Sequence, residues 1–224
     1  ISASSNTYTL GIGLSGLADG TEVITVKPAS NAIFDGGYNA ASTTQSNNTA
    51  TLNDRAGPKI SSVALAADNS TIAVTLNEAS YKTNSGSGSL EKTDFVFSLT
   101  GGTATLSSTT PSSISADGNV YTLGITISGT PSGSELLKVT PAENAIYDAK
   151  GNAASTTQSN NTANLKDKTA PTVSSVTTAS DNKIIVVTFS ESVFNTNGGS
   201  GALDSADFAF SITGGAATLT SATP

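Results

Sequence analysis

Carboxylates are the side chains of this sequence with the clearest capacity for chemistry, because most other reactive residue types are missing. The chain of 224 residues contains no Cys, His, Met or Trp. It therefore lacks a thiolate nucleophile, the commonest general base and the commonest metal ligand. Two carboxylates can hydrolyse a glycoside, but they need a deep cleft around the substrate. We therefore expect that the chain is not an enzyme.

The acidic residues recur in a regular way along the chain. Seven positions are acidic in two copies related by one fixed offset, the offset from Pro58 to Pro171, whereas only the pair Arg55/Lys168 stays basic. If the charged residues served solubility alone, acidic and basic positions should differ between the two copies to a similar extent. The acidic pairs are Glu22/Glu135, Asp35/Asp148, Asp54/Asp167, Asp68/Asp181, Glu78/Glu191, Glu91/Asp204 and Asp94/Asp207.

Some of these carboxylates are expected to converge and to bind Ca²⁺, which takes six to eight oxygen ligands. In an antiparallel sandwich, the loop after residues 71–76, the loop around Asp148 and the linker around Asp54 lie at the same end. The candidate metal ligands are Asp54, Glu78, Asp94, Asp148, Asp167 and Glu191. The alternative is a set of solvated loops in which Asp and Asn set the turn geometry. The sequence leaves both interpretations open, because it contains no dense D-x-D-x-D run.

The elements that must position these residues belong to a long internal repeat. Residues 1–111 align with 114–224 without a gap, and more than half of the positions are identical. The segment NAASTTQSNNTA occurs twice, at 39–50 and at 152–163. The period is the size of a small domain rather than of a solenoid unit. Because a charged, Pro-containing linker precedes each strand pattern, we predict three parts: the C-terminal half of a repeat (1–57), a complete repeat (58–170) and the N-terminal half of another (171–224).

Within the complete repeat, short β-rich runs alternate with turn signals, and no window shows the period of a helix. About seven strands in about a hundred residues predict an all-β fold of tandem immunoglobulin-like Greek-key β-sandwiches. The expected strands are 60–65, 71–76, 95–99, 104–106, 120–127, 136–139 and 162–165.

Two stretches carry a resemblance to a known family. The first is PTVSSVTTASDNKIIVVTFSESV from Pro171, with a TFSE-type strand end, and the second is NAIYDAKGNAAS, with a late D-x-x-G-N turn. They resemble the bacterial immunoglobulin-like tandem repeats of large cell-surface and adhesin proteins. The resemblance covers the chain repeat by repeat and implies an exported, modular protein at the cell surface. The copy at 35–39 reads DGGYN, so this turn differs between repeats.

Three functions remain in view. The first is an extracellular structural module that forms the extended stalk or fibre of an adhesin or filament, with neighbouring repeats of the same protein as head-to-tail partners. The others are a Ca²⁺-dependent module that binds a glycan or a partner protein through its loops, and an accessory domain of an enzyme. Sugar-binding platforms usually expose Trp or Tyr, but Trp is absent, and Tyr81 and Tyr38 are replaced by Phe194 and Gly151 in the other copy. A net charge of −7 argues against nucleic acid, and no apolar run is long enough to insert this fragment into a membrane.

Overall fold

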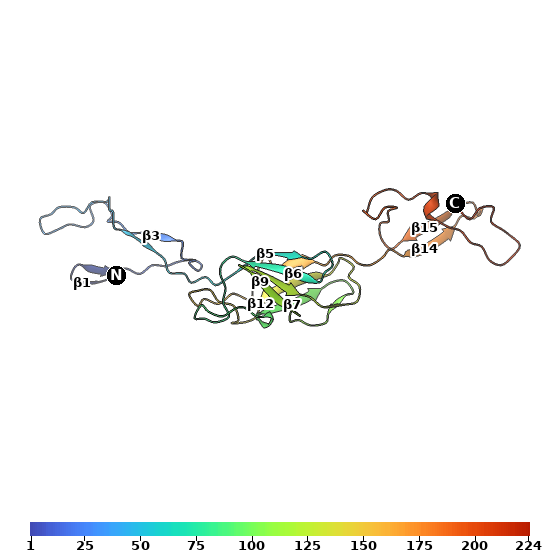
Figure 1. Ribbon diagram of the computed structural model, residues 1–224. Coiled ribbons are helices and arrows are strands. Elements are labelled where there is room, and N and C mark those ends of the chain that lie inside the picture. The colour runs from blue at the N-terminus through green and yellow to red at the C-terminus, as the bar shows by residue number, and fades with distance from the viewer. The chain divides into compact units, whose positions relative to one another are not determined.

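The computed structural model describes all 224 residues, and almost all of its regular structure is β-strand (Figure 1). Its two helices are single 3₁₀ turns, η1 (Lys92–Asp94) and η2 (Ser205–Asp207), and neither could cross a bilayer. The strands are β1 (Ser2–Ser4), β2 (Thr7–Thr9), β3 (Val23–Thr25), β4 (Thr49–Thr51), β5 (Ile60–Leu65), β6 (Thr71–Leu76), β7 (Phe95–Thr100), β8 (Thr105–Leu106), β9 (Ile114–Asp117), β10 (Val120–Gly124), β11 (Ile127–Ser128), β12 (Leu136–Pro141), β13 (Thr162–Asn164), β14 (Val173–Thr178) and β15 (Ile185–Phe189). The protein is thus all-β, with several small antiparallel sheets.

The chain divides into two compact units, Ile1–Lys168 and Thr169–Pro224. The first unit contains residues 58–168, where two larger sheets share one core. One sheet has the strand order β5-β6-β10-β9 and the other has the order β13-β12-β7. A small third sheet pairs β11 with β8. The arrangement is consistent with a β-sandwich.

The core lies between the two larger sheets because alternate side chains of each strand point to the same face. In β6 the buried residues are Ile72, Val74 and Leu76, and the residues between them are partly exposed. Phe95 of β7 contacts Tyr121 of β10 with ring centroids 5.8 Å apart, which joins the two sheets across the core. One buried cluster contains residues from both sheets.

Most of the expected strands form close to their predicted bounds, with two differences. The sequence pattern missed β9, which extends the larger sheet beside β10. It also predicted one strand over 120–127, where the structure has β10 and β11 in different sheets. Between β10 and β11, the Ile125 N–H donates to the Ser70 carbonyl, and the Thr126 carbonyl accepts from the Ser107 N–H. At this point the chain passes from one sheet to the other. A continuous β-rich run does not reveal such a change of partner.

The segments outside the complete repeat keep the same local pairings. In residues 1–57, β3 pairs with β4 in the register of β12 with β13, and β1 pairs with β2 in the register of β9 with β10. In the second unit, β14 pairs with β15 in the register of β5 with β6, including an irregularity at the same place. The repeated sequence therefore specifies these hairpins and two-stranded pairs locally.

Neighbouring residues of β12 test this account of the core. Leu137 is fully buried, whereas Leu136 is 38% exposed on the opposite face. Leu137→Ala should lower the free energy of unfolding by about 2–5 kcal/mol, because it removes buried methyl groups and leaves a cavity. Leu136→Ala should cost less than about 1 kcal/mol. Denaturant unfolding of the two variants measures the difference, and equal losses would contradict this orientation of β12.

Candidate metal centre at the linker

The linker that precedes β5 carries Asp54 and is fixed to both of its neighbours. On the side of residues 1–51, the Leu52 N–H donates to the Glu22 carbonyl at 2.8 Å and the Arg55 N–H to the Ala18 carbonyl at 2.7 Å. On the side of the complete repeat, the Asn152 side-chain amide donates to the Asp54 carbonyl at 3.3 Å. These bonds hold Asp54 beside the loop between β12 and β13.

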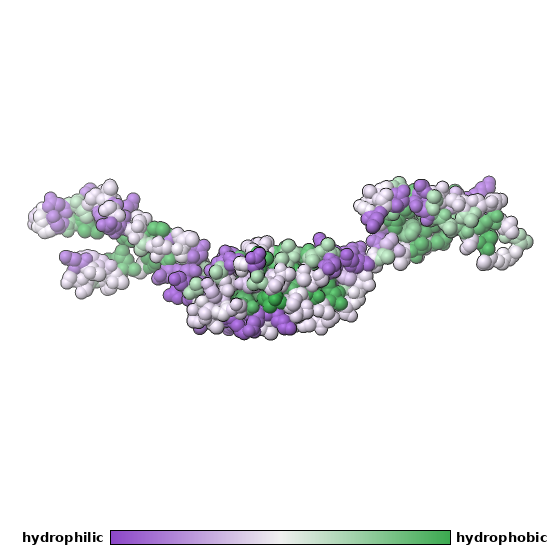
Figure 2. All heavy atoms as spheres, viewed as in Figure 1, coloured by the Kyte–Doolittle hydropathy of each residue, from purple (hydrophilic) through white to green (hydrophobic).

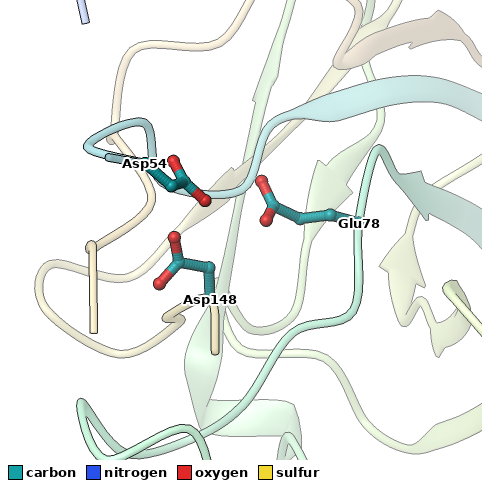
Figure 3. Close-up of side chains that lie close together, drawn as sticks. All are labelled: Asp54, Glu78 and Asp148. Atoms are coloured by element: carbon teal, nitrogen blue, oxygen red, sulfur yellow. The ribbon is translucent and has the colours of Figure 1, made fainter. Parts of the chain in front are cut away.

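Three carboxylates meet at this point. Asp54 comes from the linker, Glu78 follows β6 by two residues, and Asp148 lies in the loop between β12 and β13. One oxygen atom of each lies within 4.8 Å of the others. Figure 3 shows the three carboxylates facing one another. The loops come together because Tyr81, after β6, exchanges two backbone hydrogen bonds with Tyr147, at 2.7 and 2.8 Å.

Each carboxylate is oriented by hydrogen bonds from nearby donors. Asp148 is almost completely buried, and its Oδ1 accepts from the Lys150 and Asn152 N–H groups at 2.8 Å, while its Oδ2 accepts from the Asn152 side chain at 2.7 Å. The Asp54 Oδ1 accepts from the Ala56 N–H at 2.9 Å. Glu78 has the weakest support, a 3.3 Å bond from the Asn77 amide to Oε1.

The electrostatics of the cluster differ from one member to the next. Burial raises the pKa of Glu78, and so do the charges of Asp148 and Asp54, against a smaller opposing effect of the Asn77 hydrogen bond. Burial also raises the pKa of Asp148, but the hydrogen bonds from Asn152 and the loop backbone outweigh it and lower that pKa. The charge of Lys59 lowers the pKa of Glu78, but by less than burial and the neighbouring carboxylates raise it. Glu78 is therefore the carboxylate whose ionisation is opposed, as expected for a partly buried carboxylate beside other negative charges.

The donor set fits a hard cation. Two ligand oxygens of a Ca²⁺ ion at about 2.4 Å each can be up to about 4.8 Å apart, and the three carboxylate oxygens all lie within 4.8 Å of one another, so one ion could contact all three. Carboxylate oxygens are the ligands that Ca²⁺ prefers, and a bound ion would offset the repulsion that raises the pKa of Glu78. The Asp148 oxygens that accept N–H bonds keep further lone pairs for a metal.

The other candidate ligands from the sequence do not belong to this group. Asp94 is the last residue of η1 and is buried, and its Oδ2 accepts the Glu91 N–H at 2.7 Å in a capping box. Asp167 is exposed in the linker after β13, and Glu191 is exposed beyond β15. The structure thus brings together three of the six predicted residues, Asp54, Glu78 and Asp148.

Glu135 is a buried carboxylate that the metal hypothesis did not include. It is 0% exposed, and its side chain accepts hydrogen bonds from the backbone N–H groups of Thr103 (3.0 Å), Ala104 (3.1 Å) and Ser132 (2.9 Å). Burial raises the pKa of Glu135, but these backbone hydrogen bonds outweigh it and lower that pKa to about 2. Two repeated features of the sequence go with this buried carboxylate: the acidic pair Glu22/Glu135, and the Gly-Gly pair at 101–102 and 214–215. Gly102 has no side chain and so leaves room for the Glu135 carboxylate.

The linker after β13 is fixed to the repeat before it in the same manner as the linker before β5. The Leu165 N–H donates to the Glu135 carbonyl at 2.9 Å and the Lys168 N–H to the Pro131 carbonyl at 2.8 Å. These two bonds are the bonds of Leu52 and Arg55 shifted by one period of the internal repeat. In addition, the side chain of Asn69 exchanges two hydrogen bonds of 2.8 Å with the backbone of Lys166.

Comparison with known proteins gives little to add to this geometry. No protein-family model and no curated protein matches the chain. Among solved structures, the chain is similar to the N-terminal part of the bacterial S-layer protein SbsC, with 18% sequence identity and a TM-score of 0.34. The similarity covers 58% of this chain and 30% of that one. A TM-score this low does not establish a shared fold.

The Glu135 carboxylate leads to a prediction about acid stability. Because its pKa in the folded protein lies below the unfolded value, the folded state binds fewer protons and gains stability as pH rises. This stability is fully present above about pH 4.5 and is lost as pH falls toward about 2. Glu135→Gln should therefore lower the free energy of unfolding at pH 7 by at least about 2 kcal/mol, since buried N–H groups lose a charged acceptor.

Denaturant unfolding between pH 2 and 7 measures this effect. The difference between the native chain and Glu135→Gln should shrink as pH falls. Glu143→Gln is the matched control, because Glu143 is an exposed residue on the loop after β12. A Glu135 variant as stable as this control at pH 7 would show that the buried hydrogen bonds contribute no net stability.

Proposed function

We propose that this chain is a structural part of a bacterial cell-surface protein, in which tandem immunoglobulin-like β-sandwiches form an extended stalk or fibre. The observation that carries the proposal is the repeated attachment of the linkers. Each linker bonds the repeat before it with the same pair of backbone hydrogen bonds, at equivalent positions of the internal repeat. The linker before β5 is also bonded to the repeat that follows it, and attachment on both sides limits bending at that junction. Stiffness of this kind serves a stalk better than it serves an enzyme.

The strand order supports the immunoglobulin-like part of the proposal. In chain order, the seven strands of the two larger sheets can be lettered A (β5), B (β6), C (β7), D (β9), E (β10), F (β12) and G (β13). The sheets then read A-B-E-D and G-F-C. This is the strand order of constant-type immunoglobulin domains. The resemblance of the TFSE-type and D-x-x-G-N stretches to bacterial surface repeats supports the same assignment and an extracellular location.

The positions of the two linkers support an extended arrangement. The first linker enters at the start of β5, where the Ile60 N–H donates to the Gln158 side chain at 2.8 Å. The second linker leaves beside Asn69, in the turn at the other end of β5. Six residues of β-strand span about 20 Å, so the chain enters and leaves at opposite ends of the sandwich. We expect successive repeats joined in this way to follow one another instead of packing side by side.

Ca²⁺ at Asp54, Glu78 and Asp148 forms the second part of the proposal. The cluster joins a linker residue to two loops of the repeat that follows it. A cation bound there would neutralise the three carboxylates and hold the linker against those loops. It would thereby stiffen the junction, which is a mechanical role and not a catalytic one.

The proposed stiffness can be tested at Gly57. A Cβ atom at this position would overlap the backbone carbonyl of Ala153, so Gly57→Ala should lift the linker from the loop and loosen the junction. In small-angle X-ray scattering, the native chain should be elongated, and the variant should show a wider range of maximum dimensions. The exposed Gly36→Ala, which has no atom within 4 Å of the added methyl group, is the control. A compact particle with repeats side by side would rule out the stalk.

The proposed cation can be tested by thermal unfolding in Ca²⁺ and in chelator. At free Ca²⁺ one hundred times its dissociation constant, the stabilisation should be about 2.7 kcal/mol. Glu78→Gln should abolish this gain, and in chelator it should stabilise the chain at neutral pH, because it removes the charge whose ionisation is opposed.

The exposed Asp117→Asn is the control, and it should keep the response to Ca²⁺. If the native chain melts at the same temperature in both solutions, Ca²⁺ does not bind, and the three carboxylates serve only to form turns.

A further inference from the structure

The dipeptide Asn197-Gly198 is chemically different from its counterpart in the complete repeat, which is Asn84-Ser85. It is the only Asn-Gly pair in the chain. An Asn side chain can react with the backbone nitrogen of the residue that follows it. Glycine presents no side chain to hinder this reaction, and it adopts backbone conformations that other residues avoid. The pair therefore combines a reactive amide carbon with the least hindered backbone nucleophile.

The pair lies in a turn that has the same backbone in both copies of the repeat. Residues 197–199 are closed by a bridge between Thr196 and Ser200, and their counterparts form the same bridge in the complete repeat. The last residue of each turn, Gly199 or Gly86, has a left-handed backbone with a φ angle of +66° or +68°. Each of these glycine N–H groups donates to the carbonyl of the bridging threonine, at 3.2 and 3.1 Å. A difference in reactivity between the two turns must therefore come from the residue at the tip.

The tip residue is fixed in the complete repeat and open in the other copy. The Ser85 hydroxyl oxygen lies 2.9 Å from the Thr83 hydroxyl and 3.1 Å from the Ser87 hydroxyl, which ties the tip to the base of the turn. Gly198 has no side chain to make these contacts. No atom lies within 4 Å of the position where its side chain would begin, and its N–H donates no hydrogen bond. The Gly198 nitrogen is thus accessible to the neighbouring amide.

Exposure of the pair does not depend on an incomplete repeat. Residues 171–224 align with only the first half of the complete repeat, and Figure 2 shows hydrophobic surface on them. The complete repeat contains the same turn with all of its neighbours. There Asn84 and Ser85 are both exposed, and the Ser85 N–H also donates no hydrogen bond. A completed repeat around Asn197 would therefore leave this turn accessible to water.

We propose that Asn197 is a site of spontaneous deamidation, at which the chain gains one negative charge with time. The Gly198 nitrogen loses its proton to solvent base and attacks the Cγ carbon of Asn197. The bond from Cγ to the amide nitrogen breaks, and that nitrogen takes a proton from water and leaves as ammonia. Water then opens the cyclic succinimide at either carbonyl, which yields aspartate or isoaspartate at position 197. The inference does not depend on the cell-surface function or on Ca²⁺.

The isoaspartate product would disturb a closely packed loop, because it adds one methylene group to the main chain. In the complete repeat, this turn packs against the loop that carries Asp148. A Cβ atom on Gly151 would overlap the Asn84 carbonyl, and one on Gly86 would lie 3.0 Å from the Ala149 carbonyl. A main chain lengthened at the tip would strain these contacts. Conversion would therefore loosen this loop in a repeat with Asn-Gly and not in a repeat with Asn-Ser.

Incubation of the native chain at neutral and at mildly alkaline pH tests the site. Trypsin separates the two turns, because it cleaves the unfolded chain after Lys82, Lys92 and Lys183. Peptide 184–224 should gain the mass difference between an amide and an acid, located at position 197 by fragmentation. Peptide 83–92 should change much more slowly. The rate should rise with pH, since the nucleophile is the deprotonated nitrogen.

Gly198→Ser gives this turn the tip residue of the complete repeat, and it should slow the conversion about tenfold or more by raising the activation barrier. Conversion at equal rates in both peptides would overturn the proposal. So would an absence of conversion at position 197, or a Gly198→Ser chain that reacts like the native chain.

The reciprocal change moves the reactive pair into the complete repeat. Ser85→Gly should make position 84 convert about tenfold faster or more. Ser85→Ala is the matched control, because it removes the same hydroxyl but keeps a side chain beside the nitrogen. Both chains also carry Gly198→Ser, so that position 197 does not contribute. An alanine variant that converts as fast as the glycine variant would overturn the role of the open nitrogen.

Thermal unfolding before and after incubation tests the effect on the loop. The incubated Ser85→Gly chain should unfold at a lower temperature than the fresh chain, whereas Ser85→Ala should unfold at the same temperature before and after. If Ser85→Gly converts fully and its unfolding temperature does not change, the proposed loosening of the loop is wrong.

Discussion

The structure depends on one constraint, which is that the two sheets of a repeat share a single core that neither sheet can bury alone. Ile72 and Val74 of one sheet lie in one buried cluster with side chains that β7 and β12 contribute from the other. The local hairpins form without this partner, as β14 with β15 and β3 with β4 show. Their apolar faces then stay open. Local pairing and core formation are therefore separate steps, and the second requires strands far apart in sequence.

The recurring carboxylates mostly serve backbone N–H groups. Asp35 and Asp148 accept N–H bonds within their own loops in the same pattern, and Asp94 caps η1. The carboxylate of Glu135 accepts from three backbone donors. Because only a charged acceptor offers several strong bonds to such donors, these positions retain acid while basic residues vary. Turns and caps therefore explain most of the recurring acidic positions that pointed to a metal. Among these positions, Glu78 is the one that such hydrogen bonds explain least.

The sequence predicted the all-β class and most strands of the complete repeat, since alternation and turn residues act locally. It also predicted that Asp54, Glu78 and Asp148 lie near one another, because an antiparallel sandwich brings their loops to one end. It placed Asp94 in the same group, although Asp94 turns inward to cap η1. It missed β9 and the break after β10, where the chain changes sheets. It did not predict the burial of Glu135, because the donors in the turn after β7 lie far from Glu135 in sequence.

The two linkers are built alike on the side of the preceding repeat but differ on the other side. Gly57 allows the linker backbone to approach the Ala153 carbonyl more closely than any side chain would permit. The corresponding residue of the second linker is Ala170. A methyl group at this position is incompatible with the close approach that Gly57 makes to the Ala153 carbonyl. A stalk built from such repeats would not have uniform joints. Its stiffness would vary with one residue in each linker, while the hydrogen bonds to the preceding repeat stay the same.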